Sequence, residues 1–128
     1  MPVRETHAMI AGMSPVRQPG SFVFATLDAA PPEAIATIRE VEGLSVLLPT
    51  ETAAERGLAT DMPMAMITLQ VNSALDGIGL TAAVSRALTD IDVPCNVVAG
   101  HHHDHIFVPE VHADLAIAAL RAVAENAA

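Results

Sequence analysis

The order of apolar segments in the second half of the chain restricts the fold most strongly. Residues 62–72 (MPMAMITLQVN) alternate between two faces, which predicts a strand. Residues 80–91 place apolar side chains at helical spacing. Residues 95–100 and 105–109 are short apolar strands, and residues 111–126 carry a second helical stripe. Strand, helix, strand, strand, helix is a ferredoxin-like βαββαβ unit without its last strand.

The same periodicity predicts which side chains of this half face the core. In the strand they are Ala65, Ile67, Leu69 and Val71. In the first helix they are Leu80, Ala83, Val84, Ala87 and Ile91. In the second helix they are Ala113, Ala116, Ile117, Leu120, Val123 and Ala124.

The first half repeats this plan in a reduced form. Residues 21–27 (SFVFATL) predict a buried strand, and the prolines that follow leave room for only a brief helical turn. Residues 36–49 predict a β-hairpin with its turn at Glu42-Gly43, although residues 34–41 also fit helical spacing. Residues 50–58 (TETAAERGL) predict a two-turn helix with a threonine cap.

We therefore predict an α+β protein of two ferredoxin-like modules, the first degenerate, with antiparallel sheets and helices on one face. The predicted divisions are an N-terminal segment over residues 1–18, with a short helix and then a loop, a degenerate module over residues 19–62 and a second module over residues 63–128. The second module lacks its last strand, so its open edge should be filled from the other copy or from another subunit. An open sheet edge invites pairing, and a homodimer is the expectation.

Charge and composition argue against two classes of binding partner, nucleic acids and anionic membranes. The formal net charge is −9, with six arginines, no lysine, no tryptophan and no tyrosine. A nucleic acid or an anionic membrane needs a basic face, and base stacking needs aromatic rings, so neither partner is expected. No apolar run approaches the roughly 20 residues of a membrane span, and the N-terminal residues lack the apolar core of a signal peptide, which predicts a cytoplasmic protein.

A histidine run over residues 101–105 (HHHDH) leaves several readings open. If the strand continues through it, His101, His103 and His105 share one face and two of them can chelate a metal, although zinc requires three or four ligands. If the run forms a tight turn, the rings diverge at its tip. Cys95 or Ser73 beside a histidine is conceivable as a nucleophile, but neither lies in a recognised catalytic motif. The sequence predicts no enzyme and no cofactor.

Three stretches resemble a known family. GLTAAVSRAL (residues 79–88) and CNVVAGHHHDHIFVP (residues 95–109) resemble the second half of small bacterial proteins with tandem ACT domains. IREVEGLSVLLP (residues 38–49) is similar to the hairpin of the first module, and the resemblance covers roughly Pro19 to Leu120. It implies a plan similar to the amino-acid-sensing ACT pairs of aspartate kinases. ACT domains are ferredoxin-like regulatory modules that bind small ligands, typically amino acids, at module or subunit interfaces.

The resemblance also implies a ligand site, made by the turn after the first strand and the tip of the following hairpin. The implied residues are Ser73, Leu75, Gly77, Ile78, Gly79, Asn96, His103 and Asp104. A glycine-bearing turn before a helix exposes backbone N–H groups that suit a carboxylate, and an aspartate can accept from an ammonium group. The corresponding loop of the first module (LDAAPPEAI) has no glycine, so no equivalent site is expected there.

These inferences predict a homodimeric sensor protein that binds an amino acid. A metal-binding protein that uses the histidine run and a purely structural interaction protein are the alternatives.

Overall fold

The computed structural model describes residues 2–127. Contacts within the chain divide it into two compact units. Residues 19–64 form one, which we call the inserted unit, and residues 1–18 with 65–128 form the other, which we call the split unit. The N-terminal residues that the sequence analysis set apart therefore pack with the C-terminal half of the chain.

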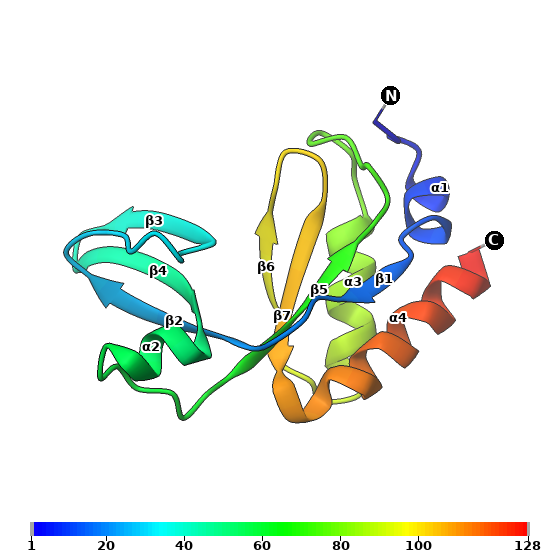
Figure 1. The fold of residues 1–128 in the computed structure, drawn as a ribbon. Helices are drawn as coiled ribbons and strands as arrows, with labels where there is room; N and C mark the ends of the chain where they lie inside the picture. The colour runs from blue at the N-terminus through cyan, green and yellow to red at the C-terminus, as the bar shows by residue number, and fades with distance from the viewer. Residues whose placement is uncertain (1, 128) are drawn as a thin grey trace. The chain divides into compact units, whose positions relative to one another are not determined.

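The inserted unit is a three-stranded antiparallel sheet with one short helix (Figure 1). Its elements are β2 (Phe22–Leu27), β3 (Ala36–Glu40), β4 (Gly43–Pro49) and α2 (Thr50–Glu55). Strand β4 lies in the middle and pairs antiparallel with both neighbours. The predicted hairpin over residues 36–49 is therefore confirmed, and the helical alternative for residues 34–41 is wrong.

Helix α2 follows directly from β4 and covers one face of this sheet. Its Ala53 is buried with Val23, Val46 and Leu48. The predicted threonine cap is wrong: the N-cap is Pro49, which makes no side-chain capping bond. The hydroxyl of Thr50 instead accepts a hydrogen bond from Ser21 Oγ at 2.8 Å.

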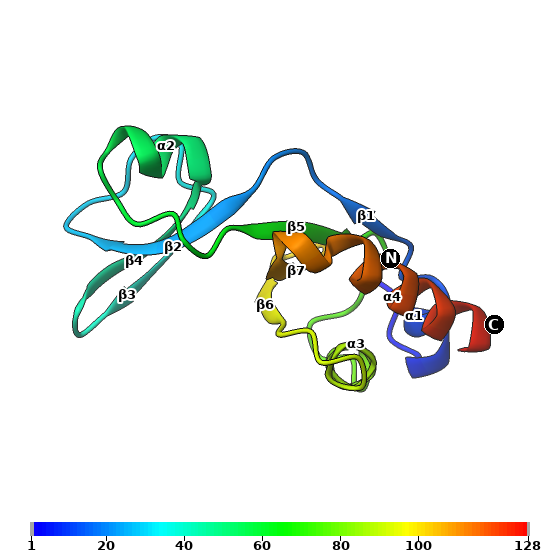
Figure 2. The same ribbon diagram turned by 90° about the horizontal axis from the view of Figure 1, so that it is seen from below.

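The split unit is a four-stranded sheet with three helices. Its strands are β1 (Pro15–Arg17), β5 (Met64–Leu69), β6 (Asn96–Ala99) and β7 (Asp104–Pro109), in the order β1-β5-β7-β6. Its helices are α1 (Thr6–Ala11), α3 (Leu80–Thr89) and α4 (Ala113–Ala127), the last preceded by a 3₁₀ turn, Glu110–His112. Helix α4 packs against both α1 and α3. Viewed from below, α3 lies beneath the strands of this unit (Figure 2).

Strand β1 corrects the expectation for the open edge. It pairs antiparallel with β5, with Pro15 opposite Leu69 and Arg17 opposite Ile67. It thus takes the edge beside the first strand of the module, where the missing last strand would lie. The edge is filled neither by the other copy nor by another subunit but by the N-terminal segment of the same chain. The sequence suggested a loop there because three residues that begin with proline are too short to show a period.

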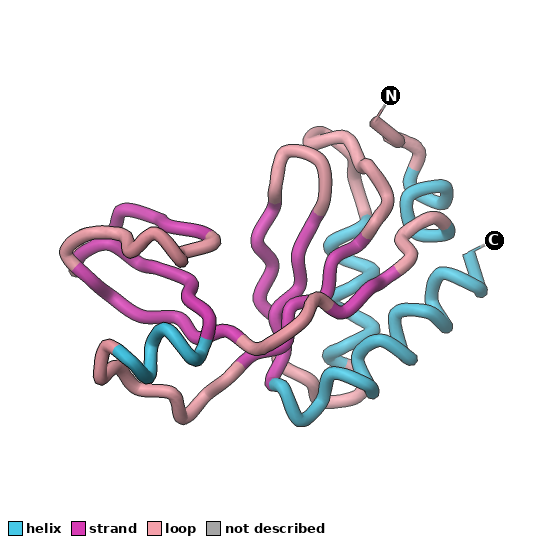
Figure 3. The backbone as a smooth tube through the Cα atoms, in the orientation of Figure 1, coloured by secondary structure: helices cyan, strands magenta, loops and turns pink. Residues whose placement is uncertain are grey.

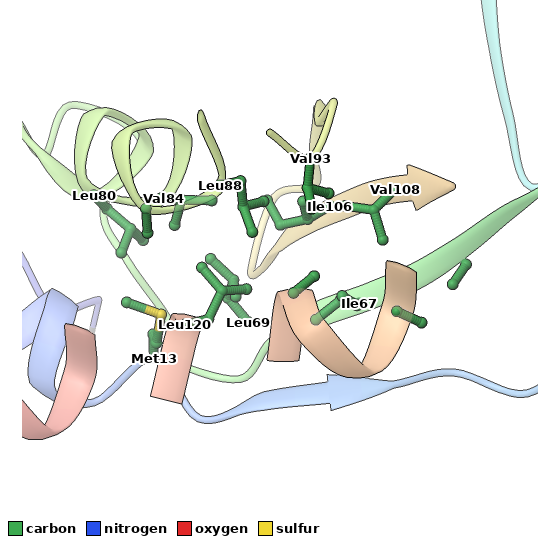
Figure 4. Close-up of a cluster of buried hydrophobic side chains, with 14 of the residues drawn as sticks. Met13, Ile67, Leu69, Leu80, Val84, Leu88, Val93, Ile106, Val108 and Leu120 are labelled. Atoms are coloured by element: carbon green, nitrogen blue, oxygen red, sulfur yellow. The ribbon is translucent and has the colours of Figure 1, made fainter. Parts of the chain in front are cut away.

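The core of the split unit lies between its sheet and its helices (Figure 4). The labelled side chains are Met13, Ile67, Leu69, Leu80, Val84, Leu88, Val93, Ile106, Val108 and Leu120. One predicted core position is wrong, because Ile91 is 40% exposed whereas Leu88 is buried completely. Helix α3 ends at Thr89 and Asp92 has a left-handed φ of 58°, so Ile91 no longer follows the helical period.

Candidate functional site

The connection between β5 and α3 lies at the same end of the split unit as the turn between β6 and β7 (Figure 3). The N-terminal residues hold this connection in place. The backbone N–H of Val3 donates to the Asn72 carbonyl at 2.6 Å, and that of Ala74 donates to the Val3 carbonyl at 2.8 Å. Arg4 Nε lies 3.0 Å from Asp76 Oδ1. These bonds join the first residues of the unit to a loop about 70 positions further along the chain.

Helix α1 explains why the connection carries glycines. Gly79 has a φ of 106°, and a Cβ there would lie 2.6 Å from Thr6 Cγ2. The Thr6 hydroxyl donates to the Ile78 carbonyl at 2.7 Å, which fixes the close approach. A Cβ at Gly77 would lie 2.8 Å from Met9 Sδ. The glycines therefore serve to pack the connection against α1 as well as to turn it.

Gly79 is also the N-cap of α3, and it offers no side chain to bond the first turn. The first N–H groups of a helix have no partner within it, and they lie at the positive end of the helix dipole. No acidic residue lies in this first turn.

The turn between β6 and β7 supplies the opposing charge. Asp104 begins β7 opposite Ala99, and the Gly100 N–H donates to the His103 carbonyl at 2.8 Å. Alternate residues of a strand share a face, and Ile106 and Val108 are buried in the core beneath the helices. The half-buried Asp104 therefore belongs to the helix-covered face of the sheet.

A cavity of about 210 Å³ lies between these elements. It brings together five of the predicted site residues: Ser73, Leu75, Gly77, Gly79 and Asp104. Its remaining lining is Met9, Ala74, Leu80, Thr81, Ala99 and Gly100. We call it the Asp104 cavity. An acidic side chain and the N-terminus of α3 line the same space, which is suited to a small molecule that carries both charges.

Three predicted site residues do not line this cavity. The Ile78 side chain is 79% exposed, although its carbonyl helps to fix the turn. Asn96 lies at the other end of β6, opposite Phe107. His103 Nδ1 lies 3.4 Å from the Val71 carbonyl oxygen.

Sequence reasoning missed some lining residues that adjoin the predicted ones, namely Ala74, Leu80, Thr81, Ala99 and Gly100, and it missed the contribution of α1 altogether. Met9 lines the cavity, and Thr6 holds the turn beside it. The only local signal was a short helix over residues 5–12, and no pattern within that helix indicates its packing partner. Their role depends on contacts that span some 70 residues of sequence.

The histidine run separates into different environments. His105 Nδ1 lies 3.0 Å from Thr68 Oγ1, and Gln18 Nε2 donates to the same oxygen at 3.0 Å. Burial, with the nearby charge of His103, lowers the pKa of His105. Within residues 2–127, no three His, Cys, Asp or Glu side chains are placed to hold a metal ion, so the metal hypothesis for His101, His103 and His105 has no support.

The Cys95 thiol is half-buried, and burial raises its pKa. A nucleophilic cysteine needs the opposite shift, because the thiolate is the reactive form. The environment of Cys95 therefore does not favour catalysis by this residue.

Two protein-family models, both described as ACT domain, match residues 2–65 and residues 62–122. The chain belongs to the ACT-domain family. The predicted pair of ACT modules and the predicted fold class are thereby confirmed. ACT domains are regulatory modules that bind small ligands, and this chain carries two of them.

Solved structures have a similar fold. A Vibrio cholerae protein of unknown function, described as a possible transport protein, is 40% identical, with a TM-score of 0.80 over 89% of this chain and 92% of its own. An Agrobacterium tumefaciens protein is 22% identical (TM-score 0.63, 84% of this chain and 83% of its own). Aspartokinase alpha and beta subunits are 13% identical (TM-score 0.61, 88% of this chain and 97% of theirs) and share the fold. No match was found among curated proteins.

Among residues 2–127, no helix is both long enough and apolar enough to cross a bilayer.

Proposed function

We propose that this ACT pair is a sensor that binds an amino acid in the Asp104 cavity. The observation that carries the proposal is the meeting of Asp104 with the uncapped N-terminus of α3 in one small cavity. The α-carboxylate of the ligand would bind the first-turn N–H groups, and its α-ammonium would bind the Asp104 carboxylate. Neither group alone distinguishes an amino acid from a simple anion or cation.

The rest of the lining bears on the side chain of the ligand. Met9, Leu80 and Ala99 give the Asp104 cavity apolar walls, and among the described lining residues Asp104 alone has a charged side chain. A charged ligand side chain would lose its hydration there without gaining a partner. We therefore expect amino acids with small apolar side chains to bind best.

A sensor of this kind regulates only if another protein chain responds to the ligand-bound form. We propose a homodimer, because β3 and β6 each end the strand order of their own unit. Ligand occupancy would then act on the dimer or on another protein, and the chain itself would perform no reaction. Sedimentation of the full chain with and without ligand measures the effect of the ligand on dimer formation.

A thermal-shift screen of the common amino acids on the full chain tests the binding proposal. A ligand present at about 100 times its Kd stabilises the folded state by about 2.7 kcal/mol, which raises Tm by several degrees. Asp104→Asn keeps the shape of the side chain and removes its charge, so the shift should disappear. Asp90→Asn, on the exposed C-cap of α3, is the matched control and should retain it. If no amino acid raises the Tm of the wild-type chain, the proposal fails and a purely structural role is favoured.

A further inference from the structure

A second cavity, of about 380 Å³, shares part of its lining with the Asp104 cavity. Ser73, Ala74 and Leu75 line both spaces. The second cavity has its own remaining lining, which includes Pro2, Arg4, Asp76, His101 and His102 and excludes Asp104 and the glycines of the turn. We call it the Arg4 cavity. Neither the sequence motif nor the proposed amino-acid site accounts for it.

The lining of this cavity is rich in N–H donors for so acidic a chain. The sequence has six arginines and six histidines against fifteen acidic residues, and the Arg4 cavity is lined by one arginine and two histidines with one aspartate. The ion pair between Arg4 and Asp76 uses Arg4 Nε, and a guanidinium carries further N–H donors at its end. The centroids of the His101 and His102 rings lie 4.7 Å apart, and each imidazole has at least one N–H donor.

The remaining lining is apolar. Pro2, Ala74 and Leu75 contribute hydrocarbon surface, and the Leu75 side chain is 71% exposed. Imidazole rings also present flat faces that can pack against a ligand. A fully hydrated anion would leave these surfaces uncovered, whereas an anion attached to an apolar body would cover them.

We propose that the Arg4 cavity is a second ligand site, which binds a small carboxylate with an apolar body. The carboxylate bonds Arg4 and the paired imidazoles, and the apolar body covers Pro2 and Leu75. This site differs from the amino-acid site in the charged groups that line it, although the two cavities share Ser73, Ala74 and Leu75.

Isothermal titration of the full chain with benzoate tests this site, with benzamide as the neutral analogue of the same shape. Benzoate should bind, and benzamide should bind about tenfold more weakly or not at all, because it lacks the charge that Arg4 recognises. Equal affinity for benzoate and benzamide would overturn the proposal. Inorganic phosphate is the third probe, and tighter binding of phosphate than of benzoate would also overturn it.

Variants at exposed positions locate the binding. Arg4→Gln and the double variant His101→Ala/His102→Ala should each weaken benzoate binding by about tenfold. Asp76→Asn should strengthen it by about two- to fivefold, because it removes the competing carboxylate from Arg4. A gain of affinity is not produced by a damaged fold, so this variant separates recognition from mere support of the loop.

Asp104→Asn distinguishes the two sites. It should abolish the amino-acid shift and leave benzoate binding unchanged, since Asp104 does not line the Arg4 cavity. If Asp104→Asn also abolishes benzoate binding, or if benzoate affinity is unaffected by Arg4→Gln and Asp76→Asn, the second site is overturned whatever the outcome of the amino-acid screen.

Discussion

The two units follow one plan and differ in what joins the first strand to the second. In the split unit that connection is a glycine-bearing turn followed by α3, and the Asp104 cavity lies at their junction. In the inserted unit the connection between β2 and β3 holds Pro31 and Pro32 and forms only turns. This connection thus has neither a helix N-terminus nor a glycine. The ligand site that we propose therefore depends on the first helix of the split unit, α3, which has no counterpart between β2 and β3.

The cores of the two units can be compared by the same substitution. Leu88 and Leu48 are both completely buried, Leu88 in the core of the split unit and Leu48 beneath the single helix of the inserted unit. We expect Leu88→Ala to lower the free energy of unfolding by about 3–5 kcal/mol and Leu48→Ala by about 2–3 kcal/mol, because a thinner core can collapse into the cavity left behind. Denaturation by urea measures both, and a larger loss for Leu48→Ala would contradict the comparison.

A glycine in each unit tests whether the turn needs space as well as conformational freedom. Gly79 and Gly57 both have positive φ values, but a Cβ would meet Thr6 Cγ2 at 2.6 Å only at Gly79, whereas at Gly57 nothing lies within 4 Å. Gly79→Ala should cost about 2–3 kcal/mol and Gly57→Ala about 1 kcal/mol, measured by urea denaturation.

The clash itself can be removed. Thr6→Ser deletes Cγ2 and keeps the hydroxyl that bonds the Ile78 carbonyl. In the Gly79→Ala background it should recover part of the lost stability, and it should not help Gly57→Ala. If the stability losses of Thr6→Ser and Gly79→Ala simply add, backbone strain alone explains the loss of stability in Gly79→Ala.

The smallest expected difference between the two units is in the pH dependence of their stability. It should arise in the split unit, at His105. Burial lowers the pKa of His105, so the folded state binds its proton less readily than the unfolded chain does. The contribution of His105 is therefore complete above the ordinary histidine pKa of about 6.5 and is lost as the pH falls through the lower folded value. Asp104, which opposes this shift, reduces the effect without changing its sign.

The inserted unit contains no histidine between residues 19 and 64. Hydrogen exchange between pH 7.5 and 5 should therefore reveal weaker protection near His105 in the split unit, and His105→Gln should remove that change. His112→Gln, at the 3₁₀ turn, is the control. Equal loss of protection in both units would exclude His105 as the cause.

The sequence predicted the elements whose side chains repeat over a long enough stretch. Helices α3 and α4 both show this, because burial of one face imposes a period. The β3–β4 hairpin was predicted instead from its turn at Glu42-Gly43, between two stretches of strand-forming residues. Ile91 was misplaced because a period cannot indicate where a helix ends. The resemblance to ACT domains, rather than any period, put Asp104 beside the glycine turn.

What the sequence could not predict depends on contacts between distant residues. Strand β1 has only three residues, and its pairing with β5 joins positions some 50 residues apart. Thr6 and Met9 are ordinary helix residues until α1 is placed against the turn at Gly77 and Gly79. The pairing of Thr68 with His105 and Gln18 likewise joins three separate segments.

The position of β1 has a consequence for biosynthesis. During translation, Pro15–Arg17 leave the ribosome long before β7 and α4 exist, and the inserted unit emerges between them. The inserted unit can therefore fold before the split unit, whose two segments, residues 1–18 and 65–128, are not yet both available. Because closing the long loop between these segments is slow, the earliest residues remain uncovered for a period in which chaperones or another nascent chain could capture them.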